Sequence, residues 1–390
     1  MVSDLALDHF SLTVNKFRKT DFRSIMSFAA HDLPTQTDDV SEYNPMQTDG
    51  FEFVEFASPN DDDSLDETFR SLGFSLVAKD RSKNVFLYRQ GQINFIVNKE
   101  PNSFASDFAA AHGPSACAMA IRVKDSEFAL NRAISLGARP YKSAINHGEV
   151  TIPAIYGVGD SLIFFVDRYD SKTIYDYDFE FLPGVDTNPK GYGLEIIDHL
   201  TNNVYQGQMT KWAGFYEKVF NFREIRYFHI TGQKTGLLSR ALTSPCGKIC
   251  IPINEPTEDS SQIAEYLREY KGEGIQHIAL TTKDIVESVN TIKQHGIKFL
   301  DISETYYEVV RERFPTLDLK YEILAKHRIL IDGEVDGDRK EILFQIFTET
   351  VIGPIFFELI QREGHQGFGE GNFSALFESM ERDQEKRGVL

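Results

Sequence analysis

The sequence predicts an α+β protein with two domains, each made of two βαβββ modules that form a curved, barrel-like mixed sheet with helices outside. Its 390 residues exceed the length at which a single hydrophobic core usually stops growing. One order of elements, an apolar strand followed by an amphipathic helix and further strands, recurs four times along the chain. A polar, turn-rich segment separates the second copy from the third, so two copies fall in each half.

The first half holds two copies of this order after an N-terminal extension. The extension, residues 1–45, shows no sustained hydrophobic period, and its residues reveal no function. The strands and the helix of the first copy are expected at 50–59, 64–74, 74–80, 85–91 and 92–98. In the second copy we expect a strand at 115–125, a helix at 126–140 and a late strand at 159–169.

The second half repeats the pattern beyond a linker at 173–192. Its strands and helices are expected at 194–204, 208–222, 223–230, 273–284, 285–297 and 355–362, with a final amphipathic helix within 371–388. The predicted domains are therefore 46–172 and 193–390.

Composition and charge exclude several classes of protein. Hydrophobic residues make up 41% and charged residues 26% of the chain, as in ordinary soluble proteins. No run of about 18 apolar residues suggests a membrane helix, and the N-terminus lacks the pattern of a secretory signal. The net charge of −18 argues against a nucleic-acid partner. Three cysteines without a CxxC pair fit a reducing cytoplasm.

The repeats let one half serve as a control for the other. When matching strands are aligned, three apolar positions of the first half correspond to polar positions of the second. Phe56 corresponds to His199, Ala118 to His277, and Val166 to Glu358. Three polar changes at matching strand positions of one half are difficult to attribute to packing. An unpaired carboxylate between Phe356 and Ile360 would also be costly in an apolar strand, so it needs a proton, a partner or a metal.

Two histidines and one glutamate on separate strands are typical of the facial triad that binds Fe(II). Such a site keeps three coordination positions open and leaves a net charge of about +1. Zn(II) also accepts these ligands, so the sequence leaves the metal open. His229 and His365 are competing ligands, for which solvent-exposed or supporting roles are favoured. Pairing of Glu358 with Arg362 is the structural alternative.

Several stretches of the second half resemble the 4-hydroxyphenylpyruvate dioxygenase family of the vicinal-oxygen-chelate (glyoxalase-like) superfamily. They are "IDHLTNNV", "PINEP", "GIQHIAL", "LFQIFTET", "FFELIQR" and "GFGEGNFSALFESMERDQEKRG", which together span most of 194–388. The stretch "GFEFVEFASP" resembles the family's non-catalytic domain. Glu370 departs from the family pattern, which commonly has Lys at that position.

The resemblance implies an Fe(II)-dependent dioxygenase of tyrosine and phenylalanine breakdown. One Fe(II) per subunit would be held by His199, His277 and Glu358. The enzyme would convert 4-hydroxyphenylpyruvate and O2 to homogentisate and CO2 by oxidative decarboxylation, ring hydroxylation and side-chain migration. It also implies that 193–390 is the catalytic domain, that 371–388 includes a gate helix, and that the protein is a cytoplasmic homo-dimer or homo-tetramer.

The resemblance further implies a set of substrate-pocket residues that are mostly uncharged amides and aromatic rings. Of these, Gln276, Gln345 and Asn254 are expected to take part in catalysis by orienting the substrate. The full set is Ser239, Asn254, Gln262, Gln276, Gln345, Phe347, Phe356, Phe368, Asn372, Phe373 and Leu376.

Other activities fit the same fold. 4-Hydroxymandelate synthase would use the same iron and substrate but hydroxylate the benzylic carbon. An extradiol dioxygenase would need histidines near the metal that act as acid and base. A metal-free binding protein of the same fold would need no metal-binding residues. Sequence also leaves open whether the product is degraded or feeds a pigment.

Overall fold

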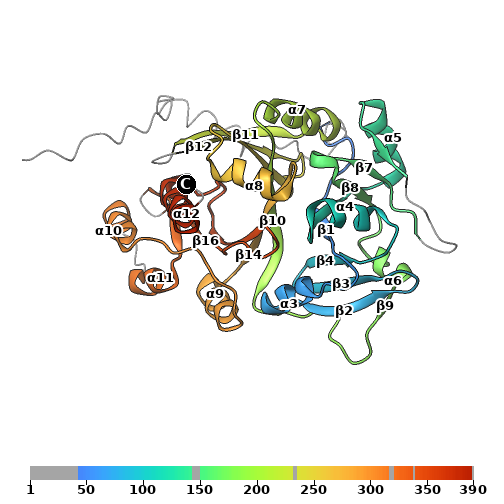
Figure 1. Ribbon diagram of the computed structural model, residues 1–390, viewed down its shortest axis with the longest axis horizontal. Coiled ribbons are helices and arrows are strands. Elements are labelled where there is room, and N and C mark those ends of the chain that lie inside the picture. Colours follow the sequence, from blue (N-terminus) through green and yellow to red (C-terminus); the bar gives the residue numbers. More distant parts are fainter. Residues whose placement is uncertain (1–42, 143–149, 232–234, 316–319, 337–338, 389–390) are drawn as a thin grey trace, which may run out of the picture. The chain divides into compact units, whose positions relative to one another are not determined.

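The computed structural model describes residues 43–142, 150–231, 235–315, 320–336 and 339–388. The predicted extension at 1–45 lies almost wholly outside these residues. The described residues from Asn44 onward form one compact unit. Figure 1 shows two curled sheets with helices on their outer faces. The predicted fold class is confirmed.

In the described part of the chain, the first sheet has nine strands. They are β1 (Phe51–Ala57), β2 (Ser75–Asp80), β3 (Val85–Gln90), β4 (Ile93–Asn98), β5 (Ser115–Arg122), β6 (Pro140–Tyr141), β7 (Ala154–Tyr156), β8 (Leu162–Val166) and β9 (Phe179–Phe181). Their order across the sheet is β6-β7-β8-β5-β1-β4-β3-β2-β9. The antiparallel β1–β5 pair joins the two modules.

The second sheet repeats this plan with eight strands among the residues that the structure describes. They are β10 (Leu194–Asn203), β11 (Arg223–Thr231), β12 (Gly236–Thr243), β13 (Cys250–Pro256), β14 (Gly274–Thr282), β15 (Leu330–Asp336), β16 (Arg339–Phe347) and β17 (Phe356–Glu363). Their order is β11-β12-β13-β10-β14-β17-β16-β15, and the antiparallel β10–β14 pair takes the place of β1–β5.

Most of the helices pack outside the sheets, but two of them, Ile174–Asp178 and Phe373–Arg387, contribute side chains to the sheet interiors. The helices are α3 (Ser64–Ser71), α4 (Phe104–His112), α5 (Ser126–Ser135), α6 (Ile174–Asp178), α7 (Met209–Phe220), α8 (Gln262–Tyr270), α9 (Ile285–Gln294), α10 (Glu304–Arg313), α11 (Tyr321–His327) and α12 (Phe373–Arg387), with 3-10 turns η1 (Val158–Asp160) and η2 (Glu370–Asn372). None of the helices in the described ranges combines the length and apolar character needed to cross a membrane.

Helices α5 and α9 begin in the same way, which fixes the alignment of the two halves. The Asp125 side chain accepts a hydrogen bond from the backbone N–H of Phe128, and Asp284 accepts one from Glu287. Both aspartates are therefore N-caps. The segment predicted as a linker, 173–192, contains α6 and β9, and β9 pairs with β2 of the first sheet.

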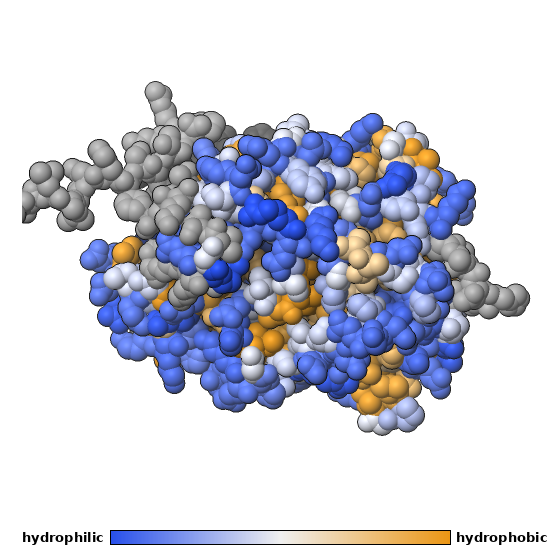
Figure 2. Space-filling model, viewed as in Figure 1, coloured by the Kyte–Doolittle hydropathy of each residue, from blue (hydrophilic) through white to orange (hydrophobic). Residues whose placement is uncertain are grey.

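A large hydrophobic core runs from the first sheet to the second. Phe95 of β4 lies at its centre, 4.4 Å from Phe74 and 6.0 Å from Phe357 of β17 between ring centroids. Phe56 and Phe69 also contact Phe95. Figure 2 shows that hydrophilic side chains dominate the visible face, while hydrophobic ones gather in patches, one of them near its centre.

Phe95→Ala is expected to lower the free energy of unfolding by about 3–5 kcal/mol, because a buried ring is lost and the sheets on both sides can only partly close the cavity. Urea unfolding checks this value. Phe128→Ala is the control, since that ring is 51% exposed and its loss should cost less than about 0.5 kcal/mol. Equal effects of the two substitutions would contradict the central place of Phe95.

The interiors of the two curled sheets differ sharply. The first is filled by a separate apolar cluster that includes Phe53, Leu87 and Tyr175. In the second, the corresponding small cluster contains Ala279, Leu343 and Ile360. Most of the second interior is therefore left to other side chains and to open space.

Strand register corrects two of the three predicted equivalences. Ala118 and His277 both lie seven residues before an N-cap aspartate, so that match holds. In the second sheet, His199 pairs with Ala279, and Ala279 with Glu358. The matching row of the first sheet is Phe53, Ala120 and Phe164.

The counterparts of His199 and Glu358 are thus Phe53 and Phe164, and the predicted Phe56 and Val166 are wrong. A two-residue shift leaves the alternation of a strand unchanged, so alternation could not reveal the error at Val166. Bulges in β1 interrupt the alternation near Phe56. The rings of Phe53 and Phe164 contact each other, with centroids 5.7 Å apart.

Candidate metal centre and pocket

Three side chains converge inside the second sheet. His199 projects from β10, His277 from β14 and Glu358 from β17, which are adjacent strands. His199 Nε2 lies 3.2 Å from Glu358 Oε2 and 3.3 Å from His277 Nε2, and His277 Nε2 lies 3.5 Å from Glu358 Oε2. Ligand atoms about 2.1 Å from one ion and at right angles lie about 3.0 Å apart. These spacings therefore suit a facial metal triad.

The burial of the triad sets its electrostatics. Burial disfavours the charged form of His199, but hydrogen bonds to Asp198 and Glu358 outweigh this and raise its pKa to about 9. Burial, together with the charge on His199, holds the pKa of His277 well below its usual range. Burial also raises the pKa of Glu358, against the attraction of His199. A divalent cation would displace the proton from His199 and balance the carboxylate.

Each ligand has a neighbour that fixes its orientation. His199 Nδ1 donates to Asp198 Oδ1 at 2.9 Å, and His277 Nδ1 donates to Gln276 Oε1 at 3.1 Å. Gln345 Nε2 donates to Glu358 Oε1 at 3.3 Å. These contacts direct both Nε2 atoms towards the centre of the triad.

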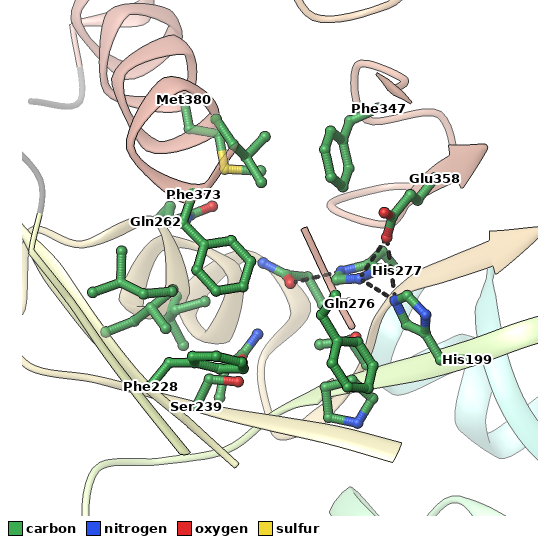
Figure 3. A pocket seen from close by; sticks show the side chains of 18 of the residues that line it. His199, Phe228, Ser239, Gln262, Gln276, His277, Phe347, Glu358, Phe373 and Met380 are labelled. Carbon is green, nitrogen blue, oxygen red and sulfur yellow. Dashed lines mark hydrogen bonds and ion pairs between the residues drawn. The ribbon is translucent and has the colours of Figure 1, made fainter. Parts of the chain in front are cut away.

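The triad forms one end of a pocket, shown in Figure 3. The pocket encloses about 680 Å³ not filled by protein atoms, part of it open to solvent. Aromatic rings and uncharged polar groups form its walls. His277 stacks on Phe356 with centroids 4.9 Å apart, and Phe373 of α12 contacts Phe228 of β11 at 4.9 Å.

Almost every predicted pocket residue lies in this lining. Those that line it are Ser239, Asn254, Gln262, Gln276, Gln345, Phe347, Phe356, Phe368, Phe373 and Leu376, together with the three predicted metal ligands. Asn372 does not line it. That side chain is fully buried behind Gln345, where its Nδ2 donates to Gln345 Oε1 at 3.3 Å and its Oδ1 accepts from Tyr306 at 2.6 Å.

Sequence reasoning missed several lining residues. They are Thr201, Phe228, Ile230, Leu237, Ala241, Pro252, Ile263 and Met380. Thr201 could have been found, because it lies two residues after His199 on the same face of β10. Phe228 and Ile230 share a face of β11, but the sequence does not show which face of that strand points inward.

The competing histidines lie outside the triad. His229 is exposed on β11, and His365 lies in the loop after β17, where its Nδ1 accepts from the Gly367 N–H at 3.1 Å. His365 belongs to a second cluster with Asp332 and Glu370. Both carboxylates there already pair with arginines, Asp332 with Arg313 and Glu370 with Arg226. This cluster is thus explained without a metal.

Comparisons with known proteins identify the family of the chain. Residues 43–180 match the family model described as "Hydroxyphenylpyruvate dioxygenase, HPPD, N-terminal", and residues 196–318 match that of the "Glyoxalase/Bleomycin resistance protein/Dioxygenase superfamily". The 4-hydroxyphenylpyruvate dioxygenase of Pseudomonas aeruginosa is 54% identical over 90% of this chain and 98% of its own length. Hemolysin VllY of Vibrio vulnificus is 55% identical over 90% and 99%.

Two solved structures share the fold. A fusion protein of a xylose isomerase-like TIM barrel and a 4-hydroxyphenylpyruvate dioxygenase has a TM-score of 0.74 and 32% identity, over 92% of this chain and 57% of that one. A mutant of 4-hydroxymandelate synthase from Streptomyces coelicolor has a TM-score of 0.73 and 25% identity, over 86% and 99%. With relatives about half identical over nearly their full length, the chain belongs to the 4-hydroxyphenylpyruvate dioxygenase family.

Proposed function

We propose that His199, His277 and Glu358 bind Fe(II), and that the protein converts 4-hydroxyphenylpyruvate and O2 into homogentisate and CO2. The observation that carries this proposal is the convergence of two imidazoles and one carboxylate at the end of a pocket with otherwise uncharged walls. Two neutral imidazoles and one carboxylate leave a bound Fe(II) with a net charge of about +1, which attracts an anionic oxo acid. When bound, Fe(II) would supply the Lewis acid that binds the oxo acid, and it would activate O2.

The protein's own side chains orient the residues that would hold the metal and the substrate. Gln276 and Gln345 hold His277 and Glu358 in place. Ser239 and Asn254 lie opposite each other on β12 and β13, where their polar groups suit the phenol end of the substrate. Neither adds a charge that would compete for the metal.

Aromatic walls exclude water from the reacting end of the pocket. Phe356 stacks on His277, and the ring of Phe368 meets that of His199 edge-on at 5.6 Å. Phe373 closes the pocket from α12. Exclusion of water protects reactive species from side reactions and strengthens each polar contact with the substrate.

We further propose that 193–390 is the catalytic domain and 46–172 a non-catalytic one joined by 173–192. The apolar filling of the first sheet interior supports this division.

Assembly as a homo-dimer or homo-tetramer and a cytoplasmic location stay predictions. Sedimentation of the purified protein tests the first. Cys117, Cys246 and Cys250 are free thiols.

Product analysis tests the proposal and separates it from its rivals. Metal-free protein is loaded anaerobically with Fe(II) or Zn(II) and then mixed with 4-hydroxyphenylpyruvate and O2. We expect homogentisate and CO2 in equal amounts with Fe(II) only. Formation of 4-hydroxymandelate would replace the proposed reaction by that of the synthase, and turnover without iron would contradict the proposed metal.

A further inference from the structure

Asp198 stands beside the predicted ligand His199 because β10 is irregular there. The β10–β14 pairing shifts register between Ile197 and His199, so Asp198 has no partner on β14. Neighbouring residues of a regular strand point to opposite faces, but a bulge can bring them together. The Asp198 carboxylate thereby accepts the Nδ1–H of His199 at 2.9 Å while its side chain stays 13% exposed.

All three guanidinium nitrogens of Arg362 donate hydrogen bonds beside Asp198. Arg362 lies on β17, four residues after Glu358, and donates from Nε and Nη2 to the two oxygens of Asp198 at 2.8 and 2.9 Å. Its Nη1 donates to the backbone carbonyls of His365 and Gly367 at 3.2 and 2.7 Å. One side chain thus links Asp198 to the loop 364–369, which leads into η2 and α12.

The same loop touches His199 by a second route. Phe368 follows Gly367 and places the edge of its ring against the His199 imidazole, with centroids 5.6 Å apart. His199 is therefore held on its Nδ1 side by Asp198 and on its ring by Phe368. Arg362 bonds both to Asp198 and to the loop that carries Phe368, so one side chain links the two contacts.

We propose that Asp198 and Arg362 are positioning residues that couple the orientation of the metal ligand His199 to the loop 364–369 in front of α12. This rests on the proposed metal site. A carboxylate that accepts the second ring N–H of a histidine fixes its tautomer and its direction towards the metal. Coupling of this kind is reciprocal, so a metal that holds His199 also holds the loop, and a held loop favours the metal.

The geometry calls for arginine rather than any cation. A lysine at position 362 would keep the charge but could not hold both carboxylate oxygens and two carbonyls with one planar group. Arg362→Lys therefore separates geometry from charge. Asp198→Asn keeps shape and volume but removes the negative charge that holds the Nδ1–H of His199.

The first half offers a matched control. Glu52 precedes Phe53, the counterpart of His199, and forms a buried ion pair with Arg122 at 2.5 Å. Its side chain is 3% exposed, so losing its charge disturbs a buried pair as Asp198→Asn does. No predicted metal ligand stands beside it.

The test measures metal binding and loop protection rather than turnover. Four metal-free proteins are titrated with Co(II) by visible absorption: wild type, Asp198→Asn, Arg362→Lys and Glu52→Gln. Amide hydrogen exchange of the loop 364–369 is followed with and without Co(II). We expect Asp198→Asn and Arg362→Lys to bind Co(II) about 10- to 100-fold more weakly. In wild type Co(II) should slow exchange of the loop, and in Arg362→Lys this protection should be lost. Glu52→Gln should match wild type in both measurements.

Two outcomes would overturn the proposal. One is Co(II) affinity within twofold of wild type in both Asp198→Asn and Arg362→Lys, and the other is equal loop protection by Co(II) in wild type and Arg362→Lys. If Asp198→Asn does not fold, Arg362→Lys alone decides. Failure of wild type to bind Co(II) through His199, His277 and Glu358 would instead contradict the proposed metal site.

Discussion

Glu358→Gln is expected to yield a folded protein that has lost its metal and its activity. Glutamine keeps the volume of glutamate in a side chain that is 3% exposed, and the amide removes a buried charge. It also removes the single anionic ligand of the triad. Loss of a residue that only hydrogen-bonds a metal ligand lowers metal affinity by up to about 100-fold, so loss of a ligand itself should lower it by at least that factor. Metal content after anaerobic loading and homogentisate formation are the measurements.

A buried carboxylate of the first sheet provides the control for this substitution. Glu55 is 8% exposed and accepts a hydrogen bond from Asn98 Nδ2 at 2.7 Å. Glu55→Gln should leave metal content and turnover unchanged. Iron retained in Glu358→Gln at the wild-type level would remove Glu358 from the proposed ligand set.

Deletion of 371–390 is expected to abolish coupled turnover. The deleted part includes α12, whose Phe373, Leu376 and Met380 form one wall of the pocket. Without this wall, water reaches the reacting end of the pocket. Any remaining decarboxylation of the substrate should then occur without hydroxylation of its ring. The ratio of homogentisate to CO2 measures the coupling. Equal amounts of the two products at the wild-type rate would exclude a gating role for the helix.

A point substitution separates closure from loss of the helix itself. The helix is tied to the sheet by Glu381, which accepts from the Thr235 N–H at 2.9 Å, and to α8 by Gln384, which donates to Glu265 at 2.9 Å. Phe373→Ala keeps these ties and opens the wall, so we expect partial uncoupling. Phe215→Ala, a half-buried ring of α7 outside the pocket, is the control.

Much of the fold could be predicted because hydrophobic periods and caps repeat. Strand β5 is apolar along most of its length, and Asp125 and Asp284 mark the start of equivalent helices. Five helices of the described residues went unpredicted. Helices α4 and α8 fall between the copies and α6 in the predicted linker, while α10 and α11 lie inside the fourth copy without a predicted counterpart in the others. Sheet order and curvature depend on pairing between distant strands, which local periodicity does not encode.

The site could be predicted where side-chain chemistry is unusual, and less well where it is not. Glu358 is conspicuous as an acid within an apolar strand, and the structure brings it to His199 and His277. The metal that they hold stays a prediction. Apolar wall residues such as Leu237 and Ile263 give no such signal, since core and pocket use the same side chains. The hydrogen bond from His199 to Asp198 depends on a bulge in β10 that no residue type in the sequence predicts.

The contrast between the two sheet interiors has a consequence for stability. Where Phe53 meets Phe164 in the first half, packing contributes to the folded state permanently. In the second half, His199 and Glu358 take the places of these two rings, and the packing contribution is missing. A bound metal and substrate would supply a stabilising contribution there only while they are present. A ligand at 100 times its dissociation constant adds about 2.7 kcal/mol. Bound substrate is therefore expected to raise the free energy of unfolding of the protein, and its removal to lower it.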